Sequence, residues 1–216
     1  QWAHELEHLA QKNNYYADYS KSKKLLIELY TINHKIELAI NEAQNMYNQA
    51  QKLNDRAGMQ EAYLCLLSSY FETMRYKEGI EVLNKALKLT LPNDSPLDQV
   101  TLYSKAVLAY SALHDNNQLF LYLKKTETAF NQFLKQNVSI LNNTYPELLL
   151  FIETHYALYH TRQQQPEKAW PHLQKAESYQ QPSSFVPYQV AYFTTCAEYY
   201  RLVHEQDKSL ECWDSA

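Results

Sequence analysis

One pattern of apolar and small residues recurs along the chain at a nearly constant spacing. In its clearest copy it consists of Tyr63, Leu66, Leu67, Tyr70, Gly79, Leu83 and Ala86. Counted from the first position of each unit, the copies begin near residues 20, 60, 100, 150 and 190. Self-similarity at such a period is typical of a solenoid, in which each unit buries its apolar face against its neighbours.

The spacing within a unit predicts a pair of helices. Because a helical turn takes about 3.6 residues, positions 4, 7, 8 and 11 share one helix face, and positions 20, 24 and 27 share another. Small residues at positions 8 and 20, such as Gly79, let the two helices approach closely. We therefore predict an all-α fold, a right-handed α-solenoid of about five antiparallel helix pairs. A leading helix is expected in residues 1–19 and the repeat domain in residues 20–216.

The composition argues against several other classes of protein. Two glycines in 216 residues cannot supply the turns of a β-protein or a glycine-rich phosphate loop. The formal charge of −4 is dispersed, which argues against nucleic-acid binding by this segment. No apolar run approaches the roughly 20 residues of a membrane span. Contact with a membrane is therefore expected only through flanking segments outside this sequence.

At the repeated positions the sequence resembles the tetratricopeptide repeat family, over roughly residues 20–216. The second unit matches best, through Tyr63, Leu66, Tyr70, Tyr76, Leu83, Ala86 and Pro92. The units here are about 40 residues long instead of roughly 34, and the usual Gly after the small turn is absent. Longer units of this kind resemble sensory regions of bacterial histidine kinases and repeat-containing transcription regulators.

Three histidines align at the position that follows the first helix of a unit. They are His34, His114 and His204, and they stand where the family normally has Gly. Since His tolerates positive φ better than most residues, we interpret them as turn residues.

The resemblance implies a concave groove lined by the first helix of each pair, where a protein, a peptide or a small polar ligand would bind. The candidate ligand-binding residues are Glu61, Ser68, Ser104, Thr154, Thr194, Glu198 and Arg201. These positions are neutral and rich in hydroxyl groups. They lack the Lys and Asn with which some tetratricopeptide domains clamp a C-terminal carboxylate, so a chaperone-tail adaptor is disfavoured.

The N-terminus contains a literal match to a zinc-peptidase motif. His4, Glu5 and His8 fit His-Glu-x-x-His, which would place two imidazoles on one side of a helix. No downstream residue is marked out as a third ligand, so a metal-dependent hydrolase is a remote alternative. We expect no enzyme activity, cofactor or functional metal, although an adventitious ion on His4 and His8 remains an open alternative.

The cysteines and tyrosines are expected to serve packing. Cys65, Cys196 and Cys212 are too few and too far apart for a disulfide framework. Cys196 falls at a core position of the last unit, and the placement of Cys212 on the next helix allows the two to approach one another. The tyrosines that share position 11 are expected in the core: Tyr30, Tyr70, Tyr110 and Tyr200.

The favoured function is a non-catalytic, ligand- or protein-binding sensory domain of a bacterial signal-transduction protein. A protein–protein interaction scaffold without a sensory role is the alternative. The last unit stops at Ala216 without a capping helix, so we expect a fragment of a longer chain. The domain would be periplasmic if it belongs to a kinase sensor and cytoplasmic otherwise.

Overall fold

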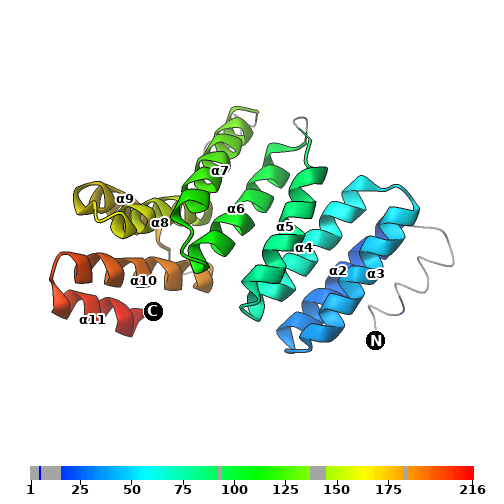
Figure 1. Ribbon diagram of the computed structural model, residues 1–216, viewed down its shortest axis with the longest axis horizontal. Helices are drawn as coiled ribbons and strands as arrows, with labels where there is room; N and C mark the ends of the chain where they lie inside the picture. The colour runs from blue at the N-terminus through cyan, green and yellow to red at the C-terminus, as the bar shows by residue number, and fades with distance from the viewer. Residues whose placement is uncertain (1–4, 6–15, 92–93, 137–144, 182–183) are drawn as a thin grey trace. The chain divides into compact units, whose positions relative to one another are not determined.

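The computed structural model describes residue 5 and residues 16–91, 94–136, 145–181 and 184–216 (Figure 1). Within this part of the chain every regular element is a helix, which confirms the all-α prediction. The helices are α2 (Tyr16–Ile32), α3 (Ile36–Lys52), α4 (Arg56–Glu72), α5 (Tyr76–Leu89), α6 (Pro96–Ala112), α7 (Asn116–Gln136), α8 (Pro146–Arg162), α9 (Pro166–Tyr179), α10 (Val186–Leu202) and α11 (Gln206–Ser215).

Consecutive helices form pairs of the predicted kind. The first helices of the pairs are α2, α4, α6, α8 and α10, each 17 residues long. Each packs against the helix that follows it, and the short connection between the two reverses the direction of the chain. The first helices begin at residues 16, 56, 96, 146 and 186, about four residues before the start counted from the sequence pattern.

The chain divides into two compact units, Gln1–Asp94 and Ser95–Ala216. In the first unit α2 packs on α3 and α4, α3 packs on α4, and α4 packs on α5. In the second unit α8 packs on α7, α9 and α10, while α6 packs on α7 and α11 packs on α10. Helix α8 is thus enclosed by its neighbours on most sides.

Every first helix ends in the same hydrogen-bonded turn. The residue after the helix cap has left-handed backbone geometry in all five pairs, at His34, Met74, His114, Gln164 and His204, with φ between 56° and 65°. Its amide donates to the carbonyl three residues earlier, and the next amide donates to the carbonyl five residues earlier. This is the Schellman arrangement, which satisfies carbonyl groups that a helix end leaves open. The interpretation of the three histidines as turn residues is confirmed.

The core consists of the repeated apolar positions. Leu66 and Leu83 are buried as expected, and Gly79 on α5 is buried with them. A Cβ atom at Gly79 would lie 2.4 Å from the ring of Phe71, so a larger residue there would require the ring to move. The tyrosines at position 11 differ from the prediction, since all four are half-buried rather than fully enclosed. Tyr110, for example, stacks on Tyr122 at 5.5 Å while part of its ring stays in contact with solvent.

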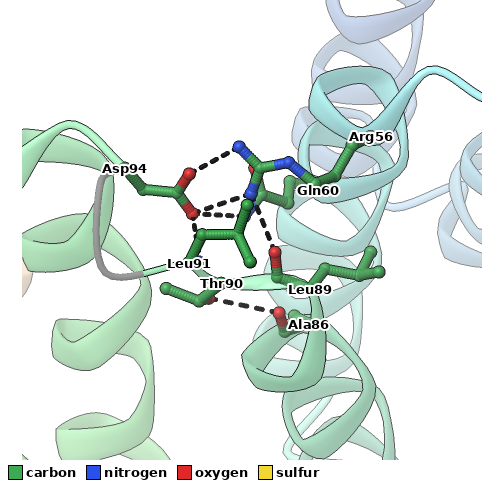
Figure 2. Close-up of polar contacts among 7 residues, drawn as sticks. All are labelled: Arg56, Gln60, Ala86, Leu89, Thr90, Leu91 and Asp94. Atoms are coloured by element: carbon green, nitrogen blue, oxygen red, sulfur yellow. Dashed lines mark hydrogen bonds and ion pairs between the residues drawn. The ribbon is translucent and has the colours of Figure 1, made fainter.

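A cluster of polar contacts fastens the end of the first unit onto α4 (Figure 2). The Arg56 guanidinium donates to both carboxylate oxygens of Asp94 and to the carbonyl oxygen of Leu89 at 2.8 Å. Asp94 also accepts the backbone amide of Leu91 at 2.8 Å and the side-chain amide of Gln60 at 3.3 Å. Hydrogen bonding to Arg56 holds the pKa of Asp94 far below its usual range. The carboxylate is therefore charged and fully engaged at neutral pH.

Candidate functional site

The structure distributes the predicted ligand-binding residues over first helices of both units. Glu61 and Ser68 lie on α4 in the first unit. The second unit carries Ser104 on α6, Thr154 on α8, and Thr194, Glu198 and Arg201 on α10. All seven are therefore on first helices, but they belong to two sets that are described separately.

In the first unit the predicted acidic residue is engaged by a neighbouring helix. The Glu61 carboxylate lies 3.3 Å from the ammonium group of Lys24 on α2. Both side chains are substantially exposed, so this ion pair contributes little to stability. Ser68 is half-buried on the same helix. These residues link two first helices without forming an enclosed site.

In the second unit a single arginine joins three first helices. Arg162 lies in the last turn of α8, and its side chain is only 14% exposed. Its Nη1 atom donates to the carbonyl oxygen of Ser111, near the end of α6, at 2.9 Å. Its Nε atom lies 3.6 Å from Oε2 of Glu198 on α10. We call Ser111, Arg162 and Glu198 the Arg162 cluster.

The position of the guanidinium follows from the helix ends around it. The Ser111 carbonyl already accepts the amide of His114 in the terminal turn of α6, and Arg162 donates to the same oxygen. Carbonyl groups at a helix C-terminus carry partial negative charge, so a cation is stabilised there. The 3.6 Å separation from Glu198 is longer than a hydrogen bond, and Nε makes none within the described residues.

Two threonine hydroxyls lie on the same helix without hydrogen-bond partners. Thr154 is 1% exposed and Thr161 is 6% exposed, and neither Oγ1 atom is hydrogen-bonded within the part of the chain that the structure describes. Their spacing of seven residues places both on one face of α8. Leaving a buried hydroxyl unpaired costs about 1–3 kcal/mol. Because α8 packs on α7, α9 and α10, these hydroxyls lie in the interior of the second unit and do not face an open groove.

A buried histidine completes this region of α8. His155 is 3% exposed, and its Nδ1 atom lies 2.7 Å from the carbonyl oxygen of Phe151. Burial, together with the nearby charge of Arg162, lowers the pKa of His155 to about 4. The imidazole is therefore neutral at pH 7 and donates its Nδ1 hydrogen to Phe151.

The remaining predicted residues in the second unit have different roles. The Thr194 hydroxyl donates within its own helix, to the carbonyl oxygen of Val190 at 2.9 Å or of Ala191 at 3.0 Å. Arg201 is exposed on α10. Glu198 contacts another first helix, through Arg162.

Sequence reasoning missed Arg162 and His155. Arg162 lies one position beyond the groove positions counted from the repeat, and His155 occupies a position that the repeat pattern assigns neither to the shared face nor to the groove. One available signal was the face of α8 on which Thr154, Leu158 and Thr161 follow at helical spacing. An arginine directly after such a face is poorly placed to reach solvent.

The metal alternative gains no support from the described residues. Among them, no group of three or more His, Cys, Asp or Glu side chains is arranged to hold a metal ion. His4 and His8 lie outside the described residues, and Glu5 is exposed. The His-Glu-x-x-His hypothesis thus stays untested. None of the helices within the described ranges is both long and apolar enough to cross a membrane.

Comparison with solved structures shows the same fold in a crystal structure described as "BtubC (BKLC) from P. vanneervenii". The TM-score is 0.73 at 14% sequence identity, and the match covers 98% of this chain and 84% of the BtubC chain. No family model and no curated protein matches the sequence. At this identity the likeness establishes the fold alone, an all-helical, repeat-like architecture.

Proposed function

We propose that the chain is a non-catalytic binding module of tetratricopeptide-like helix pairs, which binds a protein or peptide on the first-helix face of its second unit. Within a longer protein it would serve as the sensory domain of a bacterial two-component sensor or transcription regulator. The helical repeat-like fold supports the binding role. The length of the units, similar to that of bacterial sensory regions, supports the signalling role.

The Arg162 cluster is the observation that carries the binding proposal. Arg162 is held by a backbone carbonyl and by a carboxylate that stays 3.6 Å away. A ligand carboxylate can replace Glu198 and form paired, charge-assisted hydrogen bonds, which are shorter and stronger. The cluster therefore favours a ligand that carries a carboxylate.

The surroundings of the cluster favour a peptide as that ligand. Arg201 follows Glu198 by three residues on α10, so the two lie on one face of that helix and an exposed second cation lies near the cluster. We infer a peptide with an acidic side chain or a free C-terminus.

A selection from a random peptide library on the intact protein tests this proposal. Peptides that carry a carboxylate should be enriched, and Arg162→Gln should weaken their binding by about tenfold or more, since one charge-assisted pair is lost. Lys168→Gln is the matched control, because it removes one positive charge from an exposed position on α9. Circular dichroism would verify that both variants are folded.

Two outcomes would count against the proposal. The first is a selection in which no peptide is enriched on the original protein relative to the Arg162→Gln variant. The second is an equal loss of binding in Arg162→Gln and Lys168→Gln, which would indicate only general electrostatic attraction.

The sensory role and the scaffold role are separated by the rest of the reading frame. A kinase or DNA-binding module that follows residue 216 would favour a sensor. Further repeats in its place would favour a scaffold, which binds partners without an output of its own.

A further inference from the structure

Helix α11 exposes an apolar side chain at a repeat position that is buried in the other four helix pairs. Trp213 occupies position 24 of the last unit and is 50% exposed. The residues at the same position of the other units are at most 2% exposed: Ala43, Leu83, Leu123 and Leu173. Leu210 lies three residues earlier, on the same face of α11, and is 62% exposed. One face of α11 is therefore apolar and open to solvent.

Within the second unit, the corresponding face of a second helix packs against the first helix that follows it. At position 21 of α9, Trp170 stacks on Tyr199 of α10, with ring centroids 5.5 Å apart. One pair earlier, Phe120 of α7 stacks on Tyr159 of α8 at 4.5 Å. Both partners stand at position 10 of their unit. Position 21 of a second helix thus meets position 10 of the next first helix, and Leu210 is the residue at position 21 of α11.

The direction of this packing is also defined in the second unit. Trp170, near the start of α9, meets Tyr199 near the end of α10. Leu173, further along α9, belongs to a buried cluster with Cys196 and Tyr192, which lie nearer the start of α10. The second helix and the first helix that follows it are therefore antiparallel.

Helix α2 exposes the complementary face of a first helix. Leu29 stands at position 10 of the first unit and is 44% exposed, whereas Ser69 and Ala109 at the same position are fully buried. Leu25 is 45% exposed and Ile32 is 72% exposed. Because these three side chains follow at helical spacing, they form one apolar stripe on α2.

We propose that α11 of one copy of this chain packs against α2 of a second copy, in the place of a following first helix. Leu210 then meets Leu29 of the second copy, as Trp170 meets Tyr199 within the second unit. The contact involves no residue of the Arg162 cluster, so the inference goes beyond the proposed binding function. Since the two faces differ, the association is head-to-tail, and it either closes into a ring or continues as an open chain of copies.

The charges on the two helices favour this pairing over contact between two α11 faces. Helix α11 carries three carboxylates and one lysine, whereas α2 carries three lysines and two carboxylates. In the antiparallel arrangement, Asp214 of α11 points towards the start of α2, where Lys21 and Lys24 are exposed. Two α11 faces would instead bring carboxylates together, which is unfavourable.

One substitution in each face tests the proposal. Leu210→Glu and Leu29→Glu each place a charge in an apolar face at an exposed position, and circular dichroism verifies that both variants fold. Analytical ultracentrifugation of the intact protein, at concentrations up to about 1 mM, should show masses above that of the monomer. Each variant should associate at least about tenfold more weakly. Leu121→Glu is the matched control, because Leu121 on α7 is also 44% exposed, and it should associate like the original protein.

A mixture of the two variants distinguishes head-to-tail contact from contact between like faces. Leu210→Glu keeps the α2 face and Leu29→Glu keeps the α11 face, so the mixture should form a dimer with one copy of each and no larger species. An original protein that stays monomeric, or a mixture that does, would overturn the proposal. Association that persists in Leu29→Glu would also overturn it, as would an equal loss in Leu121→Glu.

Discussion

At the scale of single residues, the turns after the first helices contain backbone geometry that most side chains avoid. Left-handed φ costs a residue with a Cβ atom roughly 1–2 kcal/mol. The sequence pointed to three of these five turns, because His34, His114 and His204 belong to a residue type that tolerates such geometry. Met74 and Gln164 occupy the equivalent turn position and also have positive φ, but their residue types give no indication of it.

Met74 is the turn residue at which this strain is easiest to remove. Its side chain is 78% exposed, so a substitution sacrifices little packing. We predict that Met74→Gly increases the free energy of unfolding by about 1 kcal/mol, after the greater flexibility of glycine in the unfolded chain is subtracted. Met74→Ala keeps the Cβ atom and should give no comparable gain. Urea unfolding measures both, and a less stable Met74→Gly protein would contradict the explanation.

The buried His155 makes the stability of the folded protein depend on pH. Its pKa is about 4 in the folded protein, below the value of roughly 6.5 of a histidine in an unfolded chain. At pH values between these two pKa values the unfolded state binds more protons than the folded state. The stability that the protein gains from keeping His155 neutral is therefore complete above about pH 6.5, and it is lost as the pH falls towards 4. His155→Gln should reduce the loss of stability between pH 7 and pH 5, measured by urea unfolding. An unchanged loss would show that other groups control acid sensitivity.

At the scale of helices, the contact between α4 and α5 illustrates what the repeat pattern can predict. The small residue at position 20 of the second unit was expected to allow close approach, and Gly79 does so against Phe71. Position 20 is not uniformly small, however, since Leu119 occupies it in the third unit and is fully buried. The pattern identifies the contact, while the space available there depends on the partner side chain.

We predict that Gly79→Ala destabilises the protein by about 1–3 kcal/mol through overpacking against Phe71. The sign of this stability change is informative, because alanine is the better helix former by about 1 kcal/mol. Helix propensity alone would therefore make Gly79→Ala stabilising. Phe71→Leu removes the ring and should restore most of the stability when combined with Gly79→Ala. A double-mutant cycle by chemical unfolding gives the coupling energy, and additive effects would place the strain elsewhere.

Helix α8 shows where prediction of the candidate site fails. Its groove positions were assigned from the repeat as if one face of every first helix met solvent. In the structure, α7, α9 and α10 enclose α8, and Thr154 is buried with Thr161. Periodicity within one helix cannot reveal how completely its neighbours surround it, because that depends on packing between segments distant in sequence. The role of Arg162 follows from the same enclosure.

At the scale of the whole molecule, the chain divides into two compact units. The Lys24–Glu61 ion pair lies within the first unit, and the Arg162 cluster lies within the second. The repeat pattern continues through the boundary after Asp94, so the pattern alone does not predict where the chain divides into compact units. The Arg162 cluster lies entirely within Ser95–Ala216. The proposed binding function therefore depends on contacts within one compact unit.

Hydrogen exchange measured by mass spectrometry, on the intact protein with a library-selected carboxylate peptide, tests the central claim most directly. We predict that binding slows exchange in residues 154–162 of α8 and 194–202 of α10, and that Arg162→Gln abolishes this protection. Protection confined to α7 and α9, or to the first unit, would contradict binding at the first-helix face of the second unit.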